Sequence, residues 1–492
     1  MKKAIIIGGG VGGLATAIRL AAKNVNSGAD QQYSVTLFEK NNEVGGKLAE
    51  FSQNGFRFDM GPSLFTMPEY FEDLFQSAER NLEDYLSYKK LDKSCTYFFA
   101  DGKSFVFYND KEKLIREAKE KLGLSAEPII KYLQESEKMY NGAGKLFIEN
   151  SLHKLGTFFS VQALRSLPTL MNPANLKSLH EKNLKNLKAE KWVQLFDRYA
   201  TYNGSSPYKT PAMMAIIPHL EHNIGTFFPK GGMFGIIKAM EKLATELGVK
   251  IEKGVQVENL NLKGKIIESV VVGEKTVKAD LIVSNMDIAL VYKNLLNDPI
   301  KFKKEIKKER SSSGLVFYWG VKNTFPELSL HNILFSGDYK KEFDQIFNQK
   351  EWPTEPTVYI NISSKEELSD APNGCENWFV MINTPAGINL GKEAIKVIRT
   401  IIIKIVSQRI PRFEKSDIIA ERVLTPSDIN ERTLSMQGAL YGTASNSTMS
   451  SFTRHPNFKK HYKNLFFVGG TVHPGGGIPL CLNSAKIVVD SL

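Results

Sequence analysis

"KAIIIGGGVGGLATAIRLAAK", residues 3–23, decides the fold of this chain of 492 residues. An apolar strand runs into glycines in the pattern Gly8-x-Gly10-x-x-Gly13, and the apolar spacing after them predicts a helix. A second strand, "YSVTLFEK" at residues 33–40, completes strand–helix–strand order, which implies parallel strands with a right-handed crossover. The stretch therefore predicts a Rossmann-like dinucleotide-binding unit in an α/β protein.

The glycine turn and the second strand predict how a dinucleotide is held. Gly8 permits the tight turn, Gly10 lets the backbone approach a pyrophosphate, and Gly13 allows the helix to pack closely on the strand. The helix N-terminus offers unpaired N–H groups to the phosphates. Glu39 is expected to accept from ribose hydroxyls, although it stands 26 residues after Gly13 and not about 20. We interpret the polar run "NVNSGADQQ", residues 24–32, as an inserted loop that accounts for the difference.

Composition bounds the class of protein. With 42% hydrophobic and 24% charged residues the chain is globular, and 64 Lys+Arg against 53 Asp+Glu give a net charge of +11. A basic surface suits nucleic acid or anionic lipid, but no nucleic-acid motif accompanies it, so we expect no nucleic-acid partner. The 3 cysteines stand far apart and indicate a reducing compartment without structural zinc or disulfides. Because no apolar run reaches about 18 residues, we expect no spanning helix and a cytoplasmic protein.

Three segments look like parts of one nucleotide-binding domain, and two longer segments interrupt them. The predicted nucleotide-binding domain comprises residues 1–68, 223–290 and 416–492. Residues 69–222 and 291–415 are predicted to form an interleaved second domain, mostly helical at first and then rich in alternating strands.

Two further patterns support this organisation. "TYFFADGKSFVFY", residues 96–108, predicts a hairpin with Asp101-Gly102 at its turn. "NLFFVGGTVHPGGGIPLCLNSAK", residues 464–486, predicts a strand, a glycine-rich turn and the start of a helix. We interpret that strand as the last one of the nucleotide-binding sheet, so the end of the chain returns to the domain that its beginning starts.

Five stretches, in order along the whole chain, carry a resemblance to a known family: "GGGVGGLATAIRL", "GFRFDMGPS", "FFPKGGM", "ADLIVSNMD" and the final "NLFFVGGTVHPGGGIPLCLNSAK". They resemble the bacterial phytoene-desaturase-type carotenoid desaturases of the FAD-dependent amine-oxidase superfamily. The resemblance implies FAD as the cofactor, held by a parallel-sheet domain that is interleaved with a mixed-sheet and helical domain facing substrate and membrane. Most relatives carry Arg where this chain has Lys47, so a cationic contact to phosphate is expected but not a bidentate one.

Carried over residue by residue, the resemblance implies a set of FAD-binding residues: Gly8, Gly10, Gly12, Gly13, Glu39, Lys40, Gly46, Lys47, Gly61, Pro62, Val257, Gly470, Thr471, Gly477, Ile478 and Pro479. The strand near Val257 is expected beside the adenine, although an ordinary buried strand residue explains that valine as well. The turn around residues 473–479 is expected to lie against the flavin. Oxidation also requires a proton to leave the substrate, and the sequence identifies no catalytic base.

Other polar residues are interpreted as structural. We expect Asp59 to hydrogen-bond the turn that follows it, and His473 to order backbone in its "HPG" turn. His219 and His222 stand at i and i+3 without a third ligand in pattern, so we expect no metal site.

The implied reaction is oxidation of one C–C single bond beside a conjugated chain, with hydride going to flavin. The stretch "MGPSLFTMPEYFEDLF", residues 60–75, looks closest to hydroxycarotenoid 3,4-desaturases, which implies C-3,4 desaturation of 1-hydroxycarotenoids. Phytoene desaturation is the alternative. More distant alternatives are an amine-oxidase-like or protoporphyrinogen-oxidase-like flavoenzyme, and a flavin-free lipid-binding protein resembling Rab GDP-dissociation inhibitors. The sequence leaves oxygen and a quinone open as electron acceptor.

A carotenoid substrate implies contact with a membrane. A molecule of about forty carbons would need about 30 kcal/mol to leave a bilayer for water. We therefore expect peripheral association with the inner face of the cytoplasmic membrane. Residues 151–190 are the candidate surface, with basic residues interleaved with Phe158, Phe159, Leu164, Leu167, Leu170 and Met171. A lid helix with a solvated basic face and a buried apolar face is the alternative.

Overall fold

The computed structural model describes residues 1–26, 32–170, 172, 175, 177–447, 450 and 454–492. The predicted loop at residues 24–32 falls mostly on positions outside this part of the chain.

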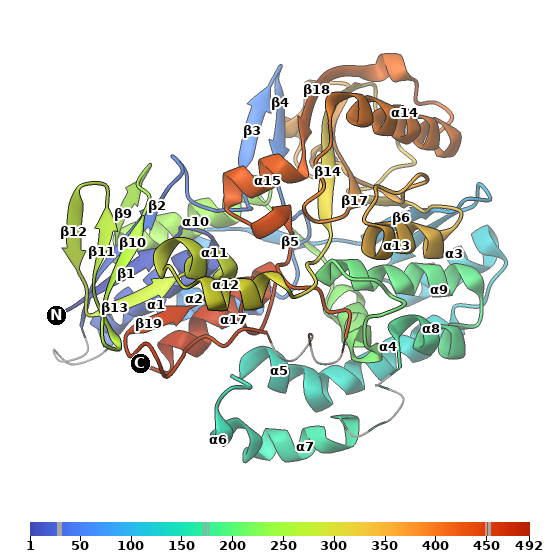
Figure 1. Ribbon diagram of the computed structural model, residues 1–492. Helices are drawn as coiled ribbons and strands as arrows, with labels where there is room; N and C mark the ends of the chain where they lie inside the picture. Colours follow the sequence, from blue (N-terminus) through green and yellow to red (C-terminus); the bar gives the residue numbers. More distant parts are fainter. Residues whose placement is uncertain (27–31, 171, 173–174, 176, 448–449, 451–453) are drawn as a thin grey trace.

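A five-stranded parallel sheet contains both the beginning and the end of the chain (Figure 1). Its strands lie in the order β19 (Leu465–Phe467), β13 (Leu281–Ser284), β1 (Lys2–Ile7), β2 (Tyr33–Glu39) and β9 (Lys250–Lys253). All four neighbouring pairs are parallel. The predicted strand–helix–strand unit is confirmed, and so is the return of the chain's last strand to this sheet.

Both faces of the parallel sheet are buried, as the unbroken apolar run of β1 requires. Ala4 and Ile6 pack with helices α1 (Val11–Asn26), α10 (Phe234–Glu246) and α17 (Ile478–Val489). Ile5 and Ile7 pack with the antiparallel sheet β10 (Asn259–Lys263), β11 (Ile266–Val272) and β12 (Lys275–Lys278) on the other face.

The C-terminal end of the chain's last helix is fixed by two contacts. Lys23 Nζ of α1 donates to the Val489 carbonyl at 2.9 Å, which places a cation at the negative end of the α17 dipole. Lys486 of α17 pairs with Asp73 at 2.7 Å, and Asp73 lies on α2 (Glu69–Gln76). The C-terminal segment is therefore part of the core and not a loose tail.

A seven-stranded mixed sheet forms the second core. Its order is β18 (Ile418–Leu424), β14 (Ser313–Lys322), β17 (Cys375–Thr384), β16 (Val358–Asn361), β15 (His331–Leu334), β6 (Lys93–Phe98) and β7 (Ser104–Tyr108). Only the pair β15–β6 is parallel among these described strands. The β6–β7 pair confirms the predicted hairpin. The amphipathic helix α14 (Lys392–Arg409) covers one face of the sheet.

Strand β18 lies on the other side of a predicted domain boundary from the strand that it pairs with. It lies inside residues 416–492, which the sequence assigns to the cofactor-binding domain, yet it pairs with β14 of the mixed sheet. The boundaries themselves stay a prediction. Two small antiparallel pairs, β3 (Glu50–Gln53) with β4 (Phe56–Asp59) and β5 (Tyr88–Lys90) with β8 (Phe227–Pro229), lie outside both large sheets.

The chain between β7 and β8 is mostly helical (Figure 1). It contains α3 (Lys111–Glu117), α4 (Glu127–Met139), α5 (Lys145–Glu149), α6 (Leu155–Phe158), α7 (Val161–Leu170), α8 (Leu179–Leu187) and α9 (Glu190–Asp197). Short helices α11 (Ile288–Leu290), α12 (Pro299–Ile306), α13 (Tyr339–Asp344) and α15 (Pro426–Thr433) connect the later strands. Within the described residues, no helix is long and apolar enough to cross a bilayer.

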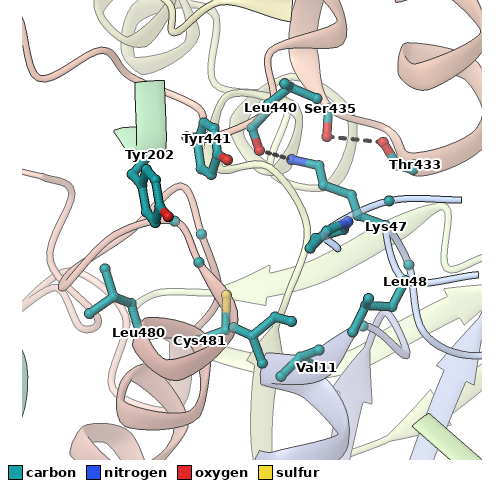
Figure 2. Close-up of a pocket in the computed structure, with 18 of the residues that line it drawn as sticks. Val11, Lys47, Leu48, Tyr202, Thr433, Ser435, Leu440, Tyr441, Leu480 and Cys481 are labelled. Atoms are coloured by element: carbon teal, nitrogen blue, oxygen red, sulfur yellow. Dashed lines mark hydrogen bonds between the residues drawn. The ribbon is translucent and has the colours of Figure 1, made fainter. Parts of the chain in front are cut away.

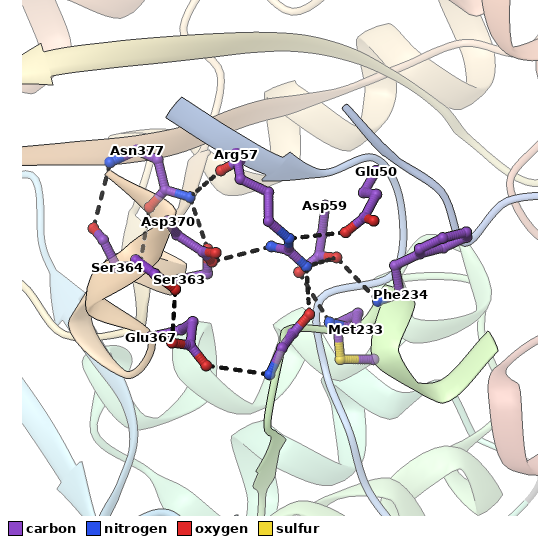
Figure 3. Close-up of polar contacts among 12 residues, drawn as sticks. Glu50, Arg57, Asp59, Met233, Phe234, Ser363, Ser364, Glu367, Asp370 and Asn377 are labelled. Atoms are coloured by element: carbon purple, nitrogen blue, oxygen red, sulfur yellow. Dashed lines mark hydrogen bonds and ion pairs between the residues drawn. The ribbon is translucent and has the colours of Figure 1, made fainter. Parts of the chain in front are cut away.

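Arg57 ties the small β3–β4 hairpin to both large units (Figure 3). Its guanidinium contacts Glu50 at 2.8 Å, Asp59 at 3.0 Å and Asp370 at 3.0 Å. Asp59 also accepts from the Met233 and Phe234 N–H groups at 2.9 and 3.0 Å, where α10 begins. The prediction that Asp59 bonds the turn after it is therefore wrong, because its carboxylate satisfies the open N-terminus of a helix distant in sequence.

Candidate functional site

One cavity of about 580 Å³ is lined by residues of both large sheets. It is lined by every residue predicted to bind the cofactor except Gly13: Gly8, Gly10, Gly12, Glu39, Lys40, Gly46, Lys47, Gly61, Pro62, Val257, Gly470, Thr471, Gly477, Ile478 and Pro479. The structure thus brings together residues from the beginning, middle and end of the chain. Their contact with a cofactor stays a prediction, which we test below against the chemistry of the lining groups.

The glycine turn between β1 and α1 is packed too closely on its neighbours to accept side chains. Gly8 has φ of 96° and its N–H donates to the Phe38 carbonyl at 2.8 Å, which holds the turn against β2. A Cβ at Gly10 would lie 2.8 Å from the Asn285 side-chain nitrogen, and one at Gly12 would lie 3.2 Å from the Gly469 Cα. Because Gly8, Gly10 and Gly12 line the cavity and carry no side chain, the backbone of the turn is bare there, where α1 offers its first N–H groups.

Gly13 does not line the cavity because it packs against the turn itself. A Cβ there would lie 2.0 Å from the Gly8 carbonyl oxygen. This agrees with close packing of helix on strand, the role that the sequence predicts for Gly13.

Glu39 lies at the carboxyl end of β2 and is 5% exposed. One carboxylate oxygen accepts from the Gly9 N–H at 2.7 Å, and the other accepts from Asn41 N–H and Nδ2 at 2.9 and 2.8 Å. These bonds fix the carboxylate in place, and each oxygen keeps lone pairs for further donors such as ribose hydroxyls. Val257 is buried beside the same cavity, but it lies in the segment between β9 and β10 and not on a strand.

Among the residues that the structure describes, five cations line the cavity: Lys40, Lys47, Arg198, Arg432 and Arg454. Arg198 is paired with Glu221, and Lys40 is partly exposed. In the other three, burial weakens the charged form. Burial lowers the pKa of Lys47 to about 8 and that of Arg454 to about 10, and it also lowers the pKa of Arg432. Of these three, the sequence analysis included only Lys47. No motif around Arg432 or Arg454 marks them, because they reach the cavity only through the tertiary fold.

The hydrogen-bond partners of these cations are mainly carbonyl oxygens. Lys47 Nζ donates to the Leu440 carbonyl and, at 3.3 Å, to the Ala439 carbonyl (Figure 2). Arg454 donates to the Tyr441 carbonyl at 3.1 Å and to the Gly470 carbonyl at 3.3 Å.

Arg432 has the same kind of environment. It lies at 3.3 Å from the Gly46 and Met60 carbonyls, and its buried Nε has no partner. Helix α15 positions it, and that helix begins with a reciprocal cap between Thr425 and Asp428. Buried cations with neutral partners are costly, so these groups suit a bound anion such as a diphosphate.

The glycine-rich turn after β19 brings a second helix N-terminus to the cavity. Gly477 has φ of 119°, and α17 begins at Ile478 with Pro479 in its first turn. A Cβ at Gly470 would lie 3.3 Å from the Gly476 Cα, so the two sides of the turn approach closely. Figure 2 shows Leu480 and Cys481 of this helix and Val11 of α1 at the cavity. Taken together, the bare turns, the fixed carboxylate and the buried cations fit the predicted dinucleotide.

His473 bonds a backbone carbonyl, but one that belongs to a distant segment and not to its own turn. Its Nε2 is paired with the Asn150 carbonyl at 2.8 Å, and burial lowers its pKa to about 4. His219 pairs with Asn223 at 2.9 Å, whereas His222 contacts Ser94 at 3.2 Å and the Tyr199 hydroxyl. In the described part of the chain, no group of three or more His, Cys, Asp or Glu side chains could hold a metal ion.

The rest of the cavity is mostly apolar and extends into the mixed sheet. Its walls come from helix α5, from the segment before β8 and from strands of the mixed sheet: Phe147, Ile148, Met213, Ile217, Leu220, Val316, Ile333, Phe379 and Met381. A buried polar cluster completes this part of the wall. In it Arg198 pairs with Glu221 at 2.5 Å, and the Tyr202 hydroxyl donates to Glu221. The sequence analysis did not identify this cluster, and no local motif marks it.

Comparison with known proteins agrees with these features. Residues 11–373 match the family described as flavin containing amine oxidoreductase. The chain is 46% identical over 493 residues to a 1-hydroxycarotenoid 3,4-desaturase of Flavobacterium sp., covering 100% of this chain and 99% of that protein. It is 32% identical over 496 residues to a 4,4'-diaponeurosporene oxygenase of Staphylococcus haemolyticus, covering 100% of this chain and 97% of that protein.

A solved structure shows the same fold. The crystal structure of an oxidoreductase from Methanosarcina mazei matches with a TM-score of 0.65 at 17% identity, covering 99% of this chain and 100% of that one. The predicted α/β architecture, with a parallel sheet and a mixed sheet plus helices, is confirmed.

Proposed function

The chain belongs to the flavin containing amine oxidoreductase family and, within it, to the carotenoid desaturase group, and from this premise we propose that it is an FAD-dependent 3,4-desaturase of 1-hydroxycarotenoids. It is a flavin-dependent oxidoreductase. The choice of FAD, of this substrate and of this bond is the proposal.

The observation that best supports this proposal is a cavity whose two ends differ in chemistry. One end has the fixed Glu39 carboxylate, three partly or fully buried cations and two helix N-termini, which suit the ribose and diphosphate of FAD. The other end has the apolar walls that a polyene needs. Bound FAD would supply a two-electron acceptor for the hydride from the oxidised carbon, since no side chain can accept it.

The chain's own residues contribute binding, orientation and the exclusion of water. Glu39 orients the ribose, and Lys47, Arg432 and Arg454 neutralise the diphosphate. The apolar walls hold the polyene and keep water away from the reacting carbons. The proton from the neighbouring carbon leaves as well, and we assign no residue to it.

The test is to supply the FAD-loaded protein with a 1-hydroxycarotenoid, with phytoene and with a diapocarotenoid. We expect the 1-hydroxycarotenoid to lose two hydrogens and gain one conjugated double bond. Activity on phytoene alone would refute the choice of substrate, and incorporation of oxygen would show an oxygenase instead. Protein that stays colourless with added FAD would refute the enzyme assignment. Anaerobic turnover with and without an added quinone decides between oxygen and a quinone as electron acceptor.

We also propose that α7 and the turn before it dock on a membrane surface. Phe159 is 85% exposed, Val161 65% and Leu164 62%, and Arg165, which follows Leu164, is exposed as well. Apolar side chains with a nearby cation are typical of an interfacial helix. Of the residues named in the prediction, Met171 lies outside the described residues, as do the side chains of Phe158 and Leu170.

The position of this surface supports a route for the substrate. Helix α5 contributes Phe147 and Ile148 to the cavity wall, and α6 and α7 follow it directly in the chain (Figure 1). A polyene that enters from the bilayer beside α7 would then reach the cavity without crossing bulk water.

Sedimentation with liposomes that contain anionic lipid tests the docking surface. The double variant Phe159→Ser/Leu164→Ser should lose most of the bound fraction. The matched control is Ile300→Ser/Leu368→Ser, which removes two side chains that are 81% and 84% exposed elsewhere on the protein. Equal binding by both variants would refute the role of α7.

A further inference from the structure

Three buried polar atoms among the described cavity-lining residues have no hydrogen-bond partner: Arg432 Nε, Tyr318 OH and His331 Nε2. The charge of Arg432 acts on the Tyr318 hydroxyl, which shows that the first two atoms are near each other. Arg432 also contacts the backbone at Gly46. Both atoms belong to the predicted cofactor end. His331 lies instead at the start of β15, and only 3% of it is exposed.

The hydrogen bonds of His331 determine which ring nitrogen carries the proton. Asn361 Nδ2 donates to the Leu330 carbonyl at 3.1 Å, which fixes the orientation of the amide. The same nitrogen approaches His331 Nδ1 at 3.2 Å, so Nδ1 is an acceptor. Burial lowers the pKa of His331 to about 4, so the ring is neutral at physiological pH and its proton is on Nε2. The unpartnered atom is therefore an N–H donor, and the imidazole that carries it belongs to a residue of the cavity wall.

A short chain of hydrogen bonds connects this donor to the predicted cofactor loop. The Tyr359 hydroxyl lies 2.8 Å from His331 Nδ1 and 2.6 Å from Ser63 Oγ. Ser63 directly follows Gly61 and Pro62, which are predicted FAD contacts. The imidazole is therefore held by two groups of the neighbouring strand β16 and lies two hydrogen bonds away from that loop.

The environment of the donor suits a neutral oxygen. Ile333, Phe379 and Met381 line the same part of the cavity, and the nearby charges of Arg198 and Glu221 are paired with each other. An uncharged acceptor would satisfy the imidazole N–H, whereas a carboxylate would have to be buried among apolar walls, with no free cation beside it among the described residues. Leaving such a buried donor without a partner costs about 1–3 kcal/mol.

We propose that His331, oriented by Tyr359 and Asn361, donates a hydrogen bond to the hydroxyl of the 1-hydroxycarotenoid and thereby selects hydroxylated substrates. This inference rests on the proposed function. The geometry is compatible with it, because the oxygen on C1 is three bonds from C3, at most about 4 Å. A donor close to the cofactor loop would place the C3–C4 bond at the cofactor end of the cavity.

The experiment compares a 1-hydroxycarotenoid with the same carotenoid lacking the hydroxyl, using FAD-loaded enzyme. Wild-type kcat/KM should favour the hydroxylated substrate by about 5- to 100-fold. His331→Leu should reduce this ratio to about 1, mostly by slowing the hydroxylated substrate. His331→Gln, which keeps an N–H donor, should retain part of the preference, and Tyr359→Phe should weaken it because the imidazole loses one of its anchors.

The matched control is Met381→Leu, which alters the cavity wall beside Tyr359 without removing a donor. It should leave the substrate ratio at the wild-type value. A wild-type ratio in His331→Leu, or a wild-type enzyme that oxidises both carotenoids equally well, would overturn the inference and leave the desaturase function standing. A wild-type enzyme that oxidises neither would refute the proposed function and the inference with it. Flavin absorbance per protein shows whether a variant is folded and binds its cofactor. If His331→Leu fails this check, the substrate ratio of His331→Gln decides whether the inference holds.

Discussion

The affinity for FAD should fall as the pH rises above about 8, because Lys47 loses its proton there in the free protein. Burial lowers the pKa of Lys47 from 10.5 to about 8, and a diphosphate beside it would favour the charged form again. Binding then takes up a proton at pH values between the free and the bound pKa. The dissociation constant should be flat below about pH 8 and rise by up to about tenfold per pH unit above it.

The size of the effect follows from the shift. A complete return of the Lys47 pKa from about 8 to 10.5 would be worth about 3 kcal/mol of binding free energy. Quenching of flavin fluorescence by FAD-free protein, titrated at several pH values, measures the dissociation constant. The titration should end near pH 9.5, because the pKa of Arg454 is lowered to about 10 and this residue would add its own slope.

Two variants isolate the contribution of Lys47. Lys47→Met should bind FAD about 10- to 100-fold more weakly at pH 7 and show no slope between about pH 8 and about pH 9.5. Lys47→Arg should bind tightly up to about pH 9.5, because a guanidinium keeps its proton to a higher pH than an ammonium in the same place. Lys238→Met, which removes an exposed lysine elsewhere, should behave like the wild type. An identical slope in the wild type and in Lys47→Met would refute the reasoning.

Three further predictions concern stability. Asp59→Ala should lower the free energy of unfolding by about 2–4 kcal/mol in urea titrations, because it uncaps α10 and removes one partner of Arg57; an unchanged midpoint would contradict this. Gly13→Ala should lower the melting temperature, because its Cβ would meet the Gly8 carbonyl at 2.0 Å, whereas Gly156→Ala, with open space around it, should not. Stability should also fall as the pH drops from about 6.5 toward 4, by up to about 1.4 kcal/mol per pH unit for each buried histidine, because the unfolded chain takes up protons that the folded chain resists. Burial lowers the pKa to about 4 for His222, His331 and His473 and to about 3 for His455; a stability independent of pH would refute this, and His455→Gln should reduce the slope.

The features that the sequence predicts well are encoded locally. The glycine turn, the β6–β7 hairpin and the strand that returns at the end of the chain each have their signal within about twenty residues, and the structure confirms all three. Glu39 could be located for the same reason, because it ends a strand that the pattern already defines.

The features that the sequence does not reveal depend on contacts between distant segments. Asp59 bonds Met233, which is 174 positions away, so its local context suggests the wrong partner. Arg432, Arg454 and His331 have no motif around them, and their chemistry becomes visible only when the fold buries them beside one cavity. Strand β18 could not be assigned to the mixed sheet from its own residues, since its partner β14 lies about a hundred positions earlier.

The cations of the cofactor site are brought together only by contacts between distant segments. Lys47, Arg432 and Arg454 come from three separate segments, and their charges meet carbonyl oxygens of still other segments. Without an anion, these buried cations oppose the packing that brings the segments together. A bound diphosphate would reverse the sign of that contribution, and ligand binding would add RT ln(1 + [FAD]/Kd) to the stability of the whole assembly. Cofactor binding is therefore expected to join the two sheets as well as to supply the oxidant, so FAD should raise the melting temperature more in the wild type than in Lys47→Met.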